Sequence, residues 1–264
     1  MTSASEVVVE WNGDVAIVRI NSPKTLNALS STNMEQLMDA LDQVEDKARA
    51  MILTGAGKGF CSGADLSGGI ETGAPITSPD YDAGLSLEMH INVLVARLRD
   101  LSVPFITSIR GAAAGAGAAL ALMGDMVVAS ETAYFLQAFS GIGLVPDAGA
   151  THLLVRTVGR VRAMELMMLG EKLYAEKALE WGLINRVVPD DQLEAASLEM
   201  AQRLASGAFS LRQIRKMAWH AMDDDWDNML NYERDMQRIA GRTQDHKEGV
   251  MAFMEKRRAK FSGK

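Results

Sequence analysis

Two short segments of small residues could bring backbone N–H groups within reach of a ligand. Residues 60–66 (FCSGADL) follow a predicted strand, and residues 111–120 (GAAAGAGAAL) open a predicted helix after another strand. Small side chains let a ligand approach the main chain, and free N–H groups at the start of a helix attract developing negative charge. Each segment alone is more typical of close helix–strand packing, but together in one α/β core they favour a ligand site.

Motifs that would supply other kinds of chemistry are absent from the sequence. It has no GxxxxGK[ST] phosphate loop, no GxGxxG dinucleotide fingerprint and no GxSxG nucleophile elbow. Cys61 has no obvious partner nearby, and the histidines match no metal-ligand spacing: they are His90, His152, His220 and His246. These absences favour chemistry carried out by backbone dipoles and carboxylates, with no metal site.

The elements that would position the two segments alternate between strands and helices. A β-hairpin is predicted for residues 7–10 and 15–20, because Asn12-Gly13 supports a tight turn. Apolar residues at helical spacing then follow from Ser31 to Val44. The alternation indicates βαβ crossovers and a largely parallel sheet. Further strands are expected at residues 50–54, 105–109 and 126–129, and further helices at 85–99 and 114–123.

Strand signals stop after about Asp147, and helices are predicted from there to the end of the chain. The chain therefore divides near residue 195 into an α/β core, residues 1–195, and a helical region, residues 196–264. The helices predicted after Asp147 span residues 149–158, 160–169, 175–181, 191–205, 210–222, 226–239 and 246–260.

The composition narrows the class of partner. The 264 residues carry a formal net charge of −7, from 34 acidic and 27 basic residues, which disfavours nucleic acid. No run approaches the ~20 apolar residues of a membrane span, and residues 1–6 lack the pattern of a signal peptide. We therefore expect a protein with no membrane partner that is cytoplasmic or lies in a matrix after removal of a transit peptide. Its one cysteine excludes an internal disulfide.

The basic residues at 256–260 are either a solvated helix end or a site for a polyanionic small ligand.

Five motifs in order resemble those of the enoyl-CoA hydratase/isomerase (crotonase) family. The resemblance implies an α/β fold: a spiral of repeated ββα units in two packed sheets, followed by a C-terminal helical region that mediates trimers. The motifs are P-x-x-x-N-A-L at residues 23–29, F-C/A-x-G-A-D-L/I at 60–66, N-G-x-A-x-G-G-G-x-x-L at 110–122, G-x-x-P-x-x-G-G at 141–149, and A-x-x-A-x-x-x-G-L-V at 174–188.

The resemblance also implies where an acyl-CoA thioester would bind. The N–H groups of Ala64 and Ala116 would form an oxyanion hole for the thioester carbonyl. CoA would lie along residues 24–28 and the 64–66 loop, and the basic C-terminal helix would approach its phosphates, in some members from a neighbouring subunit. The implied substrate-binding residues are Lys24, Leu26, Ala28, Ala64, Asp65, Leu66 and Phe139.

The carboxylates decide the subfamily. Hydratases of this family use two glutamates, which would stand at Ala119 and Phe139 here, and neither residue can move a proton. The remaining candidate is Asp147. On spacing alone it could equally cap the helix that follows. The resemblance to ring-1,2-epoxyphenylacetyl-CoA isomerases and related enoyl-CoA isomerases, which carry a catalytic aspartate there, favours a proton-transferring base. Burial in an apolar pocket would raise its pKa.

Isomerisation is therefore the expected activity, as a double-bond shift or the opening of an epoxide ring. A hydratase that uses Asp147 or an unusually placed water is an alternative, and a non-catalytic CoA-binding protein is another. An arylacyl-CoA dehalogenase is a minor alternative, because that branch has tryptophan at the place of Phe139 and histidine near Asn92, two residues from His90. No cofactor is expected beyond the CoA of the substrate, and a homotrimer or homohexamer is expected.

Overall fold

The hairpin predicted at the N-terminus opens a six-stranded sheet in the computed structural model, which describes residues 5–65, 73–75 and 77–264. The first two strands are antiparallel around Gly13, whose φ is 57°, and the others continue the sheet in parallel. The strand order is β1 (Val7–Asn12), β2 (Val15–Ile20), β3 (Ala50–Gly55), β4 (Phe105–Ile109), β6 (Met126–Ser130) and β9 (Arg186–Val188).

The structure also has a second, three-stranded sheet, and short strands in both sheets contradict two of the predictions. Its strands are β5 (Ala112–Ala114), β7 (Tyr134–Leu136) and β8 (Lys172–Tyr174). β8 and β9 both follow Asp147, so the expectation that strands stop there is wrong. The helix predicted from residue 114 begins at residue 116, because residues 112–114 are a strand. These strands are three residues long, too short to show an alternating pattern.

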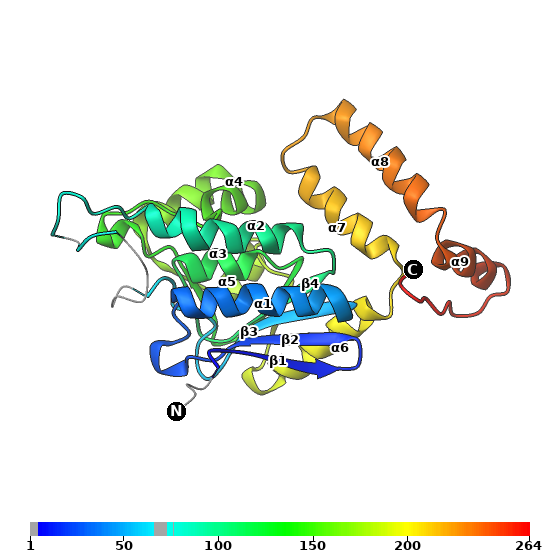
Figure 1. Cartoon of the computed structure of the whole chain (residues 1–264), viewed down its shortest axis with the longest axis horizontal. Coiled ribbons are helices and arrows are strands. Elements are labelled where there is room, and N and C mark those ends of the chain that lie inside the picture. The colour runs from blue at the N-terminus through cyan, green and yellow to red at the C-terminus, as the bar shows by residue number, and fades with distance from the viewer. Residues whose placement is uncertain (1–4, 66–72, 76) are drawn as a thin grey trace.

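Helices cover both faces of the large sheet (Figure 1). Alternate residues of β3 point to opposite sides: Met51 and Leu53 belong to the main core, whereas Ala50 and Ile52 pack with Leu193 of α6. The main core also contains buried residues of three helices that follow the strands. These are α1 (Ser31–Lys47), α2 (Asn92–Asp100) and α3 (Ala116–Leu122), and α6 (Leu193–Ala205) lies on the other face.

Local sequence explains where these helices begin and bend. At α1, the hydroxyl of Ser30 accepts from the N–H of Asn33, and the Asn33 side chain accepts from the N–H of Ser30 in return. A π-helical turn, η2 (Leu87–Ile91), precedes α2. In α4 (Ala150–Leu169), Gly159 has φ 79° and ψ 159°, which divides it into the two predicted helices. A short helix, α5 (Ala175–Glu180), follows.

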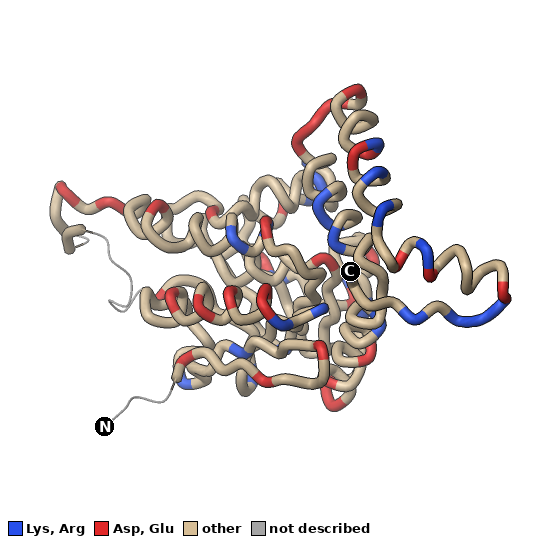
Figure 2. Tube along the Cα trace, turned by 45° about the vertical axis from the view of Figure 1, so that its right-hand side comes forward, with Lys and Arg blue, Asp and Glu red and all other residues tan. Residues whose placement is uncertain are grey.

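Three C-terminal helices extend away from the sheets: α7 (Ser210–His220), α8 (Trp226–Ala240) and α9 (Gln244–Met254) (Figure 1). None of the residues of α8 is buried. The predicted helix over residues 246–260 is too long, because α9 ends at Met254 and Lys256 takes the left-handed φ of 53°. The basic run therefore lies in an extended segment, the blue stretch at the far right of Figure 2.

That final segment is tied back to the helices. Both carboxylate oxygens of Asp245 accept hydrogen bonds, from the N–H groups of Phe209, Ser262 and Gly263 at 2.7–2.8 Å. Arg257 forms an ion pair with Glu248 at 2.6 Å. Within the residues described, no helix is long and apolar enough to cross a membrane.

Candidate active site

The two segments of small residues lie side by side. The N–H groups of Phe60 and Cys61 both donate to the carbonyl of Ala112 at 3.0 Å, and the N–H of Ala114 donates to the carbonyl of Cys61 at 2.9 Å. Residues 60–64 thus run parallel to β5 and reach the start of α3. The expectation that the two segments share one core is confirmed.

Glycine is required where these segments meet. Gly63 has φ 97°, and a Cβ atom there would lie 2.8 Å from the carbonyl oxygen of Ala114 and 3.6 Å from the nitrogen of Ala116. Gly115 has φ 53° and ψ −128°, a backbone conformation that only glycine adopts readily, because every other residue carries a Cβ atom. The pair places Ala64 against the N-terminal end of α3.

The N–H groups of Ala64 and Ala116 are both left without an acceptor among the described residues. The N–H of Leu29 donates to the Gly63 carbonyl at 2.7 Å, and the N–H of Asp65 donates to the Leu29 carbonyl at 2.9 Å. Since successive peptide groups of extended chain point to opposite sides, the Ala64 N–H points away from Leu29. Ala116 is the first residue of α3, so it has no acceptor within the helix.

The segment expected to carry CoA adjoins this loop. Lys24 is exposed and lies in a short 3₁₀ turn, η1 (Pro23–Thr25). Leu26 is also exposed and has a left-handed φ of 53°, whereas Ala28 is buried. The N–H of Ser62 donates to the carbonyl of Leu26 at 3.0 Å, so the chain just before Ala64 lies against residues 24–28. Leu66, also predicted to bind CoA, lies outside the described residues.

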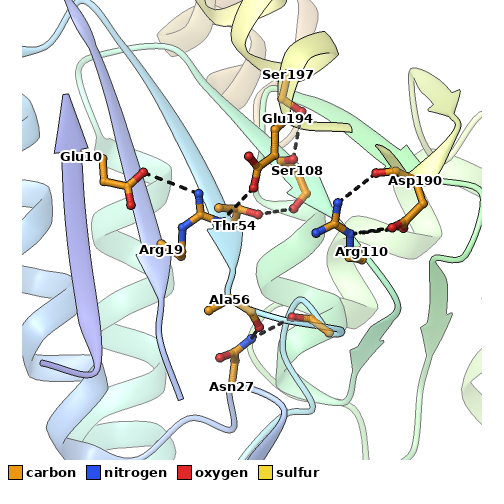
Figure 3. A network of polar contacts seen from close by, with 11 residues as sticks. Glu10, Arg19, Asn27, Thr54, Ala56, Ser108, Arg110, Asp190, Glu194 and Ser197 are labelled. Atoms are coloured by element: carbon orange, nitrogen blue, oxygen red, sulfur yellow. Dashed lines mark hydrogen bonds and ion pairs between the residues drawn. The ribbon is translucent and has the colours of Figure 1, made fainter. Parts of the chain in front are cut away.

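Asn27 ties residues 22–27 to the turn that precedes Phe60, a role that was not predicted from the sequence. It is fully buried and left-handed, with φ 58°. Its side-chain amide donates to the carbonyls of Ala56 and Gly59 at 2.9 and 2.8 Å (Figure 3). Its side-chain oxygen accepts from the N–H of Ser22 at 2.9 Å. Its place in the P-x-x-x-N-A-L motif was the available signal. Elsewhere in Figure 3, Thr54, Ser108 and Ser197 link β3, β4 and α6.

Asp147 is not a helix cap. The N-cap residue of α4 is Gly149, with φ 81°, and no side chain caps that end. Ala148 is also left-handed, with φ 52°, and only the backbone carbonyl of Asp147 accepts from the helix, from the Ala150 N–H at 2.8 Å. Among the described residues, side-chain atom Oδ1 of Asp147 is buried and has no hydrogen-bond partner. The capping alternative is therefore wrong.

Burial controls the acidity of this carboxyl. Removal from water raises the pKa of Asp147 from 3.8 to about 6, because the ionised form loses solvation and gains no compensating partner. Such a carboxylate is still ionised at neutral pH but is a stronger base than a solvated aspartate. Cys61 is fully buried, and burial raises the pKa of its thiol to about 12, so it cannot act as a nucleophile near neutral pH.

The two positions where a hydratase would carry glutamates are buried and apolar. Ala119 is fully buried in α3. Phe139 is 6% exposed, and its Cζ atom would lie 3.8 Å from a Cβ placed on Gly115, beside the Ala116 amide. The predicted substrate residue Phe139 thus adjoins the start of α3.

Three buried side-chain atoms lack a hydrogen-bond partner within the described part of the chain: Oδ1 of Asp147, Oε1 of Gln137 and Nε2 of His90. Asp147 was predicted from the sequence, His90 was considered as a metal ligand and as the histidine of a dehalogenase but assigned to neither, and Gln137 was not predicted. No sequence pattern marks a missing partner, because the partners of a buried side chain are set by the tertiary structure.

Two sheets wound in ββα turns, with small-residue loops meeting at a helix start, define a crotonase-type enzyme. The family described as enoyl-CoA hydratase/isomerase matches residues 10–264, and the chain belongs to that family. An enoyl-CoA hydratase from Bacillus anthracis has the same fold, with a TM-score of 0.90 and 30% identity, over 98% of this chain and 100% of that one. The predicted family and fold are confirmed.

Curated relatives include both isomerases and hydratases. The chain is 45% identical to 1,2-epoxyphenylacetyl-CoA isomerase of Escherichia coli K12, over 95% of each protein. It is 34% identical to trans-2-decenoyl-[acyl-carrier-protein] isomerase of Streptococcus mutans, over 98% of each. It is also 34% identical to short-chain-enoyl-CoA hydratase of Clostridium acetobutylicum, over 96% of each. The chain is thus an enzyme of this family, and the family admits both reactions.

Proposed function

We propose that this enzyme is an acyl-CoA isomerase in which Asp147 moves a proton between two carbons of the acyl group. The observation that carries the proposal is the Asp147 side chain, whose Oδ1 is buried, does not cap α4 and has no partner in the described part of the chain. A buried carboxylate without a partner is costly to the fold. Such a cost favours a functional role, and we place this carboxylate in the site that the free amides of Ala64 and Ala116 would form.

The amides of Ala64 and Ala116 would bind the thioester oxygen. Removing a proton next to the thioester places negative charge on that oxygen, and two N–H donors already in position stabilise the resulting enolate. Each such donor contributes about 3 kcal/mol to transition-state stabilisation. Because the donors are backbone groups fixed by Gly63, Gly115 and the start of α3, they need no reorganisation as charge develops.

One base then suffices for the whole reaction. The Asp147 carboxylate takes a proton from one carbon and becomes a carboxylic acid, while the electron pair delocalises into the thioester enolate. The acid returns the proton at another carbon, and the C=C bond is left in a new position. In an epoxide, the enolate electrons instead break the C–O bond of the ring, and the Asp147 acid gives its proton to the resulting alkoxide, which becomes a hydroxyl group. Substrate and product have the same mass.

The residues at the two positions expected to hold hydratase glutamates support isomerisation over hydration. Hydration in this family uses two carboxylates, and the positions expected to hold them carry Ala119 and Phe139. Phe139 places an apolar ring beside the start of α3, where a water would otherwise be held by glutamate. A single carboxylate and an apolar wall are sufficient for a proton shift.

The proposal includes CoA binding along residues 24–28 and an assembly of three or six copies. The C-terminal helices support self-association, because α8 has no buried residue while Trp226 and Phe253 are 76% and 85% exposed. Apolar helix faces of this kind are typical of protein interfaces. Light scattering that finds only a monomer at micromolar concentration would contradict this part of the proposal.

The experiment that tests the reaction is a mass-spectrometric screen of enoyl-CoA and epoxyacyl-CoA substrates in D₂O. We expect products of unchanged skeleton that carry deuterium only through proton exchange. A product enlarged by one water would show a hydratase, and replacement of halogen by hydroxyl would show a dehalogenase. Binding without any turnover across the screen would favour a CoA-binding protein.

A further inference from the structure

A left-handed turn, residues 147–150, joins Asp147 to α4. Its two central residues, Ala148 and Gly149, both have positive φ, at 52° and 81°, and the N–H of Ala150 donates to the backbone carbonyl of Asp147 at 2.8 Å. Positive φ at both central positions, closed by this hydrogen bond, is the pattern of a type I′ turn. Such turns are most common between the two strands of a hairpin, whereas this one stands directly before a helix.

The left-handed turn takes up the hydrogen bond that a helix cap would use. An aspartate three residues before Ala150 would, as an N-cap, accept the Ala150 N–H through its side chain. Here the backbone carbonyl of Asp147 accepts that N–H instead, and no side chain caps α4. Oδ1 of Asp147 stays buried, with no partner among the described residues. The turn therefore keeps this carboxyl group off the end of the helix.

Packing does not explain the glycine at position 149. Gly149 is exposed, and a Cβ atom placed on it would meet no described atom within 4 Å. At Gly63, by contrast, a Cβ atom would lie 2.8 Å from a backbone oxygen. The requirement at Gly149 is thus conformational, because a φ of 81° is readily adopted only by a residue without Cβ. Its neighbour Ala148 anchors the turn, since it is 2% exposed and belongs to the main core.

We propose that Gly149 is a positioning residue for the reaction, because the left-handed turn that it permits holds the Asp147 carboxylate away from α4 and available to the acyl group. The assignment rests on the proposed function, in which Asp147 is the base. If residues 148 and 149 took right-handed helical angles, α4 would begin earlier and Asp147 would be its N-cap. Backbone strain of this kind gathers at functional sites, where the surrounding structure maintains it.

The left-handed turn would also set the basicity of the carboxylate. A carboxylate that accepts N–H groups of a helix is stabilised in its ionised form, so its pKa falls. A lower pKa makes it a weaker base. Capping α4 would therefore both misplace Asp147 and reduce its power to remove a proton from carbon.

Two substitutions at position 149 separate conformation from volume. The side chains of Gly149→Ala and Gly149→Asn would both enter free space, but asparagine adopts the left-handed conformation far more readily than alanine. The matched control is Gly182→Ala, because Gly182 is also exposed, has φ 75° and has room for a Cβ atom. With trans-3-hexenoyl-CoA as substrate, we expect kcat of Gly149→Ala to fall about 10- to 100-fold. Gly149→Asn should keep most of the wild-type kcat, and the control should keep all of it.

A ¹³C NMR titration of the Asp147 carboxyl gives a readout that does not depend on turnover. The pKa of about 6 in the wild type should fall toward 3.8 in Gly149→Ala and stay unchanged in Gly149→Asn and in the control. The proposal is overturned if a folded Gly149→Ala protein keeps the wild-type kcat and titration. It is also overturned if the larger asparagine is more harmful than alanine, because volume and not φ would then matter. Failure of the isomerase assignment would appear instead as full turnover by a folded Asp147→Asn enzyme, while the titration still reports on the turn.

Discussion

Replacing Asp147 with asparagine should abolish isomerisation while leaving the fold intact. Asparagine keeps the shape of the side chain but has no basicity. Because no second carboxylate stands at Ala119 or Phe139 to substitute for it, we expect turnover to fall by about 10³-fold or more. Binding of a saturated acyl-CoA should change little, since the thioester contacts are made by the backbone.

The same substitution should stabilise the protein at neutral pH. The rise in the pKa of Asp147 from 3.8 to about 6 corresponds to ~3 kcal/mol at 1.36 kcal/mol per unit. Because the half-buried carboxyl keeps contact with solvent, its ionisation should destabilise the folded protein by about 1–2 kcal/mol instead. Between pH 3.8 and 6 the folded protein binds more protons than the unfolded chain, so this group lowers stability as pH rises through that window. If Asp147 were a helix cap, the substitution would have the opposite effect, because removing a cap lowers the free energy of unfolding by about 1 kcal/mol.

Two measurements complete this test. Deuterium incorporation into substrate, followed by mass spectrometry, reports proton transfer, and kcat/KM of the wild type should rise with pH through an apparent pKa near 6. Thermal unfolding at pH 4 and pH 7.5 reports how ionisation of Asp147 affects stability. The melting temperatures of the wild type and the Asp147→Asn enzyme should differ only at the higher pH. A folded Asp147→Asn enzyme with wild-type turnover would refute the mechanism.

Other substitutions test the remaining parts of the site. Ala116→Pro removes the second oxyanion donor, and proline is tolerated at the first residue of a helix. Turnover should therefore fall ~100-fold while the melting temperature stays near that of the wild type. Wild-type turnover in this variant would exclude the Ala116 amide from the mechanism. Asn27→Ala deletes three hydrogen bonds of a fully buried side chain and should cost about 2–4 kcal/mol in urea unfolding, whereas a loss below 0.5 would contradict its role. Ala119→Glu with Phe139→Glu supplies the hydratase carboxylates, and a product one water heavier should appear if the variant folds. Leu230→Glu on α8 should shift the protein to monomer in light scattering, and an unchanged mass would show that α8 is not an interface.

The parts of the fold that were predictable are those in which local sequence and tertiary structure agree. The Asn12-Gly13 turn identified the first hairpin, and the spacing of Met34, Leu37 and Val44 identified the buried face of α1. By contrast, β5 is three alanines that pair with residue 61 and with β7, and alanine has no preference for strands. The early end of α9 depends on a left-handed Lys256, a conformation that lysine does not signal.

The site was predictable where a motif encodes backbone geometry. Gly63 and Gly115 stand where only glycine fits, so the loops around Ala64 and Ala116 could be placed from residue type alone. The orientation of Asp147 could not, because it depends on two successive left-handed residues, one of which is Ala148. The incomplete hydrogen bonding of His90 and Gln137 exists only once distant segments are folded together.

The burial of Cys61 makes this enzyme a convenient subject for labelling. It is the one cysteine of the chain, it is fully buried, and its thiol stays protonated at any pH used for maleimide coupling. The unmodified protein therefore offers no background reaction. A cysteine introduced at Val145, which is 78% exposed and two residues from Asp147, would be the sole reactive thiol. A fluorophore attached there would report directly on what enters the site.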